Sequence, residues 1–221
     1  MKKLFTNDKL FKTSAIICAI CTAIYIVCFF SWSWGSGLAD LPWLFPDVAL
    51  GVCSVILYVS YSRHNKNLMK GLIGFVLGVI LADHVQYLAY YISNDDVFYV
   101  FSFFNVVCTA VIIINHCILN SSRKSKSVSV TVNQAVLLLN AFGFVVSYIF
   151  YMTAPSADFV NPSAVDYIST IADGIIFILT FVLICCVESR LDAYRIDREN
   201  AGWTEEEGYP EGYIHEYQKN K

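Results

Sequence analysis

Six long runs of apolar residues alternate with short polar segments along this chain of 221 residues. The runs cover roughly residues 13–32, 43–62, 71–93, 97–119, 132–152 and 164–187. A helix needs about 20 mostly apolar residues to cross the hydrocarbon core of a bilayer. The pattern therefore predicts an all-α integral membrane protein, with a six-helix transmembrane bundle over residues 1–188.

The positively charged residues divide the connections between these runs into two classes. All 15 Lys and Arg residues lie before the first run or in the connections that follow the second, fourth and sixth runs. The other connections contain only acids among their charged residues, namely Asp40, Asp95, Asp96 and Asp158. Because Lys and Arg concentrate in cytoplasmic loops, both termini are predicted to be cytoplasmic. We expect the membrane to be the plasma membrane.

The first run has an alternative interpretation as a cleaved signal peptide. It follows four lysines and precedes small residues at positions 37 and 39. However, its uncharged stretch extends over residues 13–39, which is longer than the core of an ordinary signal peptide. We therefore expect this segment to remain as the first transmembrane helix.

Composition supports the same class and limits the expected partners. Hydrophobic residues make up 57% of the chain and charged residues 15%, whereas a soluble domain has about 25% charged residues. There is no strongly basic patch, so the expected partner is the lipid bilayer and not nucleic acid. All eight cysteines fall within the predicted helices, where Cys acts as a small hydrophobic residue. We predict no disulfide framework, no metal site and no cofactor.

Each predicted helix has one stripe of polar or small residues at helical spacing. In chain order the stripes comprise Ser14, Cys18, Cys21, Tyr25 and Cys28; Asp47, Gly51, Ser54, Tyr58 and Tyr61; Asp83, Gln86, Tyr87 and Tyr90; Ser102, Asn105, Thr109 and His116; Asn133, Asn140, Ser147 and Tyr151; and Asp166, Ser169, Thr170, Asp173 and Thr180. Polar side chains are costly in hydrocarbon unless they face protein or water, so we expect the stripes to face inward. Gly74 and Gly78 are expected to pack against another helix.

Two acids within the runs are explained by helix starts. Asp47 follows Pro46, and Pro is favoured at the first position of a helix, where the helix dipole also favours an anion. Asp166 follows Ser163 at the spacing of a capping box. We therefore expect both acids to mark helix starts near the outer surface.

Asp83, His84 and Asp173 have no such explanation. Asp83 and Asp173 lie about ten and nine residues from the outer ends of their helices, or roughly 15 Å at 1.5 Å per residue. A charged side chain near the bilayer centre costs roughly 2.5–3.5 kcal/mol. His84 lies about 100° around the helix from Asp83, so the two side chains should face different neighbours. Asp173 is expected either to pair with His84 or to share a proton with Asp83.

These residues predict an ionisable site between the third and sixth helices. Orienting hydrogen bonds are expected from four further residues, Gln86, Tyr87, Asn105 and Thr170. No Lys or Arg lies within any run, which favours a neutral or cationic small molecule, or protons, as the ligand. His116 lies closer to the end of its helix, where we expect it to snorkel or to cap the helix C-terminus.

Short sequence matches predict an inverted repeat of two three-helix units. Residues 21–23 match residues 108–110, and residues 59–61 match residues 146–148. The Ala-Asp pair at 82–83 is repeated at 172–173. Corresponding helices would run in opposite directions, as an inverted repeat requires.

Three functions are consistent with this pattern. The first is membrane transport or ligand binding at the ionisable site. The second is a subunit or scaffold that binds a protein partner, in part through the acidic cytoplasmic tail at 189–221, which we expect to be partly disordered. The third is an intramembrane enzyme with a lipid-like substrate, which would need an Asp–His contact of hydrogen-bond length. No catalytic motif is present, so we expect the first function and lean against an enzyme.

Overall fold

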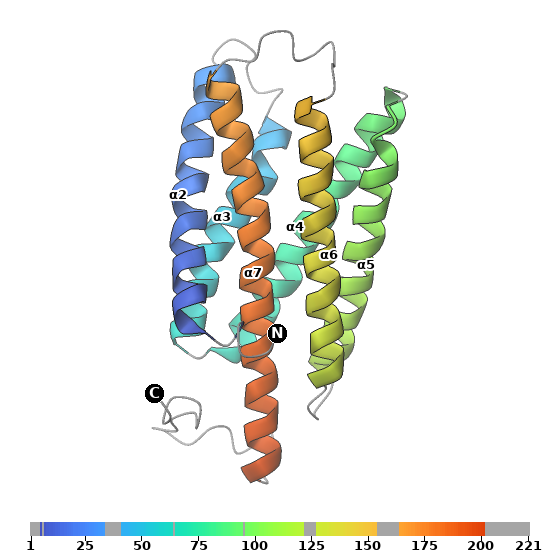
Figure 1. Cartoon of the computed structure of the whole chain (residues 1–221). Coiled ribbons are helices and arrows are strands. Elements are labelled where there is room, and N and C mark those ends of the chain that lie inside the picture. Colours follow the sequence, from blue (N-terminus) through green and yellow to red (C-terminus); the bar gives the residue numbers. More distant parts are fainter. Residues whose placement is uncertain are drawn as a thin grey trace.

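The computed structural model describes residues 5, 7–33, 41–63, 65–94, 96–121, 127–153 and 164–201. Within these residues the chain forms six helices, which are shown in Figure 1. They are α2 (Asp8–Ser33), α3 (Leu41–Ser62), α4 (Lys66–Ser93), α5 (Tyr99–Ser121), α6 (Ser127–Thr153) and α7 (Ala164–Ala201). The predicted all-helical architecture is confirmed.

Five of these helices are long and apolar enough to cross a membrane. Their apolar segments are Asp8–Ser31, Leu44–Ser62, Lys66–Ser93, Tyr99–Ser121 and Ala164–Ile196. The apolar segment found in α6, Val128–Gly143, is shorter, although the whole helix has 27 residues. Large hydrophobic side chains such as Val27 (66% exposed) and Phe142 (65% exposed) cover the outer surface, as lipid contact requires. The chain is a multi-pass helical membrane protein.

The helices run alternately up and down, and each packs against the next in the chain (Figure 1). The last helix, α7, closes the bundle because it packs along α2 and also contacts α3 and α6. The end where α2 begins is at the bottom of Figure 1. We call it the basic end because it has all the described Lys and Arg residues, which are Lys9, Lys12, Arg63, Lys66, Lys70, Arg190, Arg195 and Arg198.

Most of the described stripe positions face the interior, as predicted, although Tyr90 is 44% exposed. Every helix contributes buried polar side chains, among them Ser14, Ser54, Asp83, Asn105, Asn140 and Thr180. They lie beside an apolar core whose largest fully buried residues include Phe11, Phe177 and Phe181. The stripe positions Ser147 and Tyr151 lie outside the described side chains. All eight cysteines are free, and all but Cys117 are buried.

Two predictions about local packing are wrong. Pro46 does not begin a helix: α3 starts at Leu41, and Pro46 lies inside it. Transmembrane helices tolerate such a proline because neighbouring groups satisfy the freed carbonyl. A Cβ atom added to Gly74 or Gly78 would meet nothing within 4 Å, so among the described residues these glycines do not pack against another helix. The inverted repeat and the cytoplasmic location of the termini stay predictions.

The last helix is longer than its apolar run. It has 38 residues, or about 57 Å at 1.5 Å per residue, and it extends beyond the other helices at the basic end (Figure 1). The helix continues past the last apolar run as far as Ala201, and Glu188, Ser189 and Asp192 are buried against the bundle. Residues 202–221 lie outside the described part of the chain.

Candidate functional site

Three carboxyl groups from three helices meet in the half of the bundle away from the basic end. Asp47 of α3 is hydrogen-bonded to Asp173 of α7 and to Tyr25 of α2. Asp83 of α4 is close enough to interact electrostatically with both Asp47 and Asp173. We call these four residues the carboxyl cluster.

The helix positions of these residues place the cluster away from the ends of the helices. Counted along their helices, the four residues lie about 9–15 Å from the helix ends at the opposite side to the basic end. Asp47 and Asp83 are each only 6% exposed, while Asp173 and Tyr25 are half-buried. The cluster is therefore screened from bulk water by the four helices that form it.

The contact between Asp47 and Asp173 determines the chemistry of the cluster. An ionised carboxylate can only accept hydrogen bonds, so a hydrogen bond between two carboxyl groups needs a proton on one of them. The Tyr25 hydroxyl donates to Asp47 and supplies a second hydrogen bond. The cluster can therefore hold, gain or release protons, or hold a small cation in place of a proton.

Asp47 lies in the carboxyl cluster and not at a helix start, where the sequence pattern placed it. Its position after Pro46 indicated a helix start, but the helix already has six residues before it. The signal that could have identified it is its place in the same stripe as Gly51 and Ser54, which are both buried. Tyr25 was in the stripe of its own helix, but nothing local to its sequence indicated a partner on α3.

His84 belongs to a different group of polar residues, between α4, α5 and α6. Its Nδ1 atom lies 3.1 Å from the Thr109 hydroxyl, which accepts a hydrogen bond from the Asn140 amide at 2.9 Å. Its ring is 5.5 Å from that of Phe177. The prediction that Asp83 and His84 face different neighbours is confirmed. Of the two arrangements expected for Asp173, the structure supports the grouping with carboxyl groups, with Asp47 as the hydrogen-bond partner.

Three buried polar atoms in this second group have no hydrogen-bond partner in the described part of the chain. They are His84 Nε2, Asn105 Oδ1 and Asn140 Oδ1. Asn105 Oδ1 also lies 3.3 Å from the position that a Cβ atom would have on Gly143, so the absent side chain leaves room for the amide. An unsatisfied buried polar atom costs about 1–3 kcal/mol, so water or a ligand is expected to satisfy these atoms.

The remaining predicted residues lie around the two groups. Thr170 is half-buried one turn before Asp173 on α7. Gln86 is half-buried one turn beyond Asp83, and the half-buried Tyr87 stacks on Tyr91 with ring centroids 6.2 Å apart. Among the described residues, no group of three His, Cys, Asp or Glu side chains is placed to hold a metal ion.

The expected role of His116 is wrong. The side chain neither snorkels nor caps a helix, because it is only 4% exposed and its Nδ1 atom lies 3.3 Å from Glu188 of α7. Sequence reasoning missed Glu188 as a partner because it follows the last apolar run.

No protein-family model matches this chain, and no curated protein or solved structure matches it. Its function therefore rests on the chemistry of these polar residues.

Proposed function

We propose that this chain is a small membrane transport or ligand-binding protein whose site is the carboxyl cluster of Tyr25, Asp47, Asp83 and Asp173. The observation that carries the proposal is the meeting of three acids from three helices, with Asp47 hydrogen-bonded to Asp173. His84 and Asn105 line the neighbouring part of the interior and add hydrogen-bonding groups on the other side of α4.

The carboxyl cluster has no fixed positive charge near it in the sequence of its helices. A single ionised side chain at the bilayer centre costs roughly 2.5–3.5 kcal/mol, and three acids at one place would also repel one another. The sequence has no Lys or Arg at residues 13–62, 71–122 or 127–189, so no fixed cation can offset them. The cluster must take its positive charge from protons or from a mobile cation. That proton or cation is then the species that the protein transports or senses.

The inward direction of the polar stripes favours this function over a scaffold. A scaffold that recognises its partner through polar side chains would present them on an outer face, whereas the described polar residues gather inside the bundle. An enzyme of the type considered would need an Asp–His contact, but the Nδ1 atom of His84 contacts Thr109. The distribution of Lys and Arg supports a cytoplasmic basic end.

A thermal-shift measurement on the detergent-purified protein tests the proposal. The probes are small alkylammonium ions and their neutral alcohol analogues, each at two pH values. A ligand present at 100 times its dissociation constant stabilises the protein by about 2.7 kcal/mol. We expect a stabilising probe whose effect depends on pH and disappears in Asp47→Asn and Asp173→Asn.

Asp96→Asn is the matched control. Asp96 lies between α4 and α5, away from the cluster, and accepts a hydrogen bond from the Phe98 backbone that asparagine can also accept. This variant should keep the wild-type response to every probe. If no probe acts on the wild type and the cluster variants are only less stable, the acids are structural and the proposal is wrong.

A further inference from the structure

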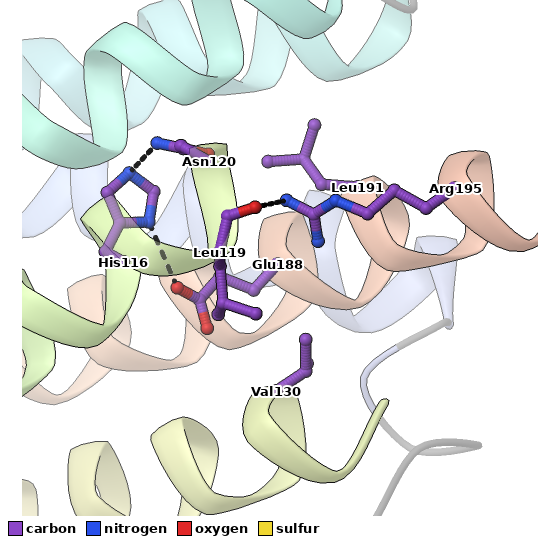
Figure 2. Close-up of a pocket in the computed structure, with 7 residues that line it drawn as sticks. All are labelled: His116, Leu119, Asn120, Val130, Glu188, Leu191 and Arg195. Atoms are coloured by element: carbon purple, nitrogen blue, oxygen red, sulfur yellow. Dashed lines mark hydrogen bonds and ion pairs between the residues drawn. The ribbon is translucent and has the colours of Figure 1, made fainter. Parts of the chain in front are cut away.

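A second cluster of buried ionisable residues lies at the basic end, between α5, α6 and α7. Glu188 of α7 accepts hydrogen bonds from the Asn133 amide at 2.8 and 2.9 Å, and its Oε1 atom lies 3.3 Å from His116 Nδ1. Figure 2 shows His116 and Glu188 directed towards each other across the helices. Glu188 is 3% exposed and His116 is 4% exposed.

The charges around this pair indicate that His116 carries a proton. Arg195 lies beside Glu188, but its guanidinium donates to the Leu119 carbonyl at 2.8 Å and lies 3.9 Å from Asp192. Asp192 is fully buried and is therefore the acid that Arg195 neutralises. A buried carboxylate needs a positive partner of its own, and for Glu188 that partner is the His116 ring.

The surroundings of the other ring nitrogen fit a doubly protonated ring once the Asn120 amide is turned. His116 Nε2 lies 3.4 Å from the Lys70 carbonyl and 2.8 Å from the Asn120 amide nitrogen, whereas the Asn120 oxygen has no partner in the described residues. Flipping the side-chain amide of Asn120 exchanges the positions of its oxygen and nitrogen without moving another group. The oxygen then accepts from Nε2–H, and both ring nitrogens have acceptors.

We propose that His116 and Glu188 form a second proton-binding site, separate from the carboxyl cluster. Histidine suits this role because its charge changes near physiological pH more readily than that of other side chains. Beside the pair lies a cavity of about 10 Å³, which is close to the minimum for one water molecule and gives the proton a partner for exchange. The other charged residues that face or flank the pair are Lys70 on α4, and Arg195 and Asp192 on α7.

The two sites lie far apart along the bundle. Glu188 lies 15 residues after Asp173 on α7, or about 22 Å along the helix. The buried rings of Phe177 and Phe181 lie between them on the same helix. When His116 loses one proton, the neutral ring can still donate from Nδ1 to Glu188, but the attraction between opposite charges is lost, so the contact between α7 and α5 weakens at the basic end.

Nitrogen NMR of ¹⁵N-histidine-labelled protein in lipid bilayers tests this site, because protonated and unprotonated ring nitrogens have separate signals. The chain has four histidines, and the spectrum of His116→Asn identifies the His116 signals. At neutral pH we expect both ring nitrogens of His116 to be protonated in the wild type. In Glu188→Gln, which keeps an acceptor but removes the charge, we expect this doubly protonated signal to be lost.

Asp83→Asn is the control, since it alters the carboxyl cluster and should leave the His116 signals unchanged. An unprotonated His116 nitrogen in the wild type at neutral pH would overturn the proposal, and that measurement needs no variant beyond the one used for assignment. A doubly protonated ring that persists in Glu188→Gln would also overturn it. Neither outcome bears on ligand binding by the carboxyl cluster, so the two proposals fail separately.

Discussion

Gly51→Ala tests the packing that holds the carboxyl cluster together. Gly51 of α3 is buried against Thr22 of α2, one turn from the contact between Asp47 and Tyr25. A Cβ atom on residue 51 would overlap the Thr22 hydroxyl and methyl groups and would lie 2.6 Å from Thr22 Cβ. Thr22 cannot easily move aside, because its hydroxyl donates to the Cys18 carbonyl at 2.8 Å.

Gly74→Ala is the matched comparison, because a Cβ atom there meets nothing within 4 Å. Both substitutions gain about 0.5–1 kcal/mol from the better helix propensity of alanine, so this gain cancels in the difference. Overpacking costs about 1–3 kcal/mol, and each kcal/mol shifts the Tm of a protein of this size by roughly 2–4 °C. The Gly51 variant should therefore unfold about 2–12 °C below the Gly74 variant.

The assay is thermal unfolding in detergent, followed with a thiol-reactive fluorophore. Seven of the eight cysteines are buried and become reactive only when the bundle opens. The Thr22→Gly substitution removes the overlapping atoms. In that background, Gly51→Ala should therefore lower the Tm much less than it does in the wild type. Equal Tm values for the Gly51 and Gly74 variants would refute the close contact between α2 and α3.

Other substitutions test the core, the basic end and the outer surface. Phe177→Ala removes a ring that is 1% exposed and should cost about 3–5 kcal/mol, whereas Phe142→Ala, at 65% exposed, should leave the Tm in detergent nearly unchanged; equal losses would contradict the assigned burial. Tyr61→Phe removes the hydroxyl that donates to Asp8 at 2.7 Å and should cost about 1.5 kcal/mol, and an unchanged Tm would show that this hydrogen bond adds nothing. A lipophilic maleimide should label Cys117 before any other cysteine of the native protein, and mass mapping that finds a different first site would count against the orientation of α5.

The apolar runs predicted the helices well because hydropathy reports directly on lipid contact. The run at 97–119 corresponds to α5, Tyr99–Ser121, with a shift of two residues at each end. The last run ends at residue 187, but α7 continues to Ala201. Residues such as Arg, Glu and Ala favour a helix without being apolar, so hydropathy marks the end of the lipid-facing segment and not the end of the helix.

The candidate site was predicted only in part because its contacts join distant segments. Depth along the helix grouped Asp83 with Asp173, of which Asp83 is buried and Asp173 half-buried, and helical spacing separated His84 from Asp83. The partnership of Asp47 with Asp173 depends on how α3 is rotated against α7, which no local pattern records. The same holds for His116 and Glu188, whose positions are 72 residues apart.

Infrared spectroscopy of the protein in lipid bilayers at neutral pH tests the carboxyl cluster most directly. A protonated carboxyl group has a C=O stretching band that is separate from the bands of ionised carboxylates and shifts in D₂O. The hydrogen bond between Asp47 and Asp173 predicts such a band in the wild type and its loss in Asp173→Asn, with no change in Asp96→Asn. A wild-type spectrum without this band, or an identical band in Asp173→Asn, would contradict a shared proton in the cluster.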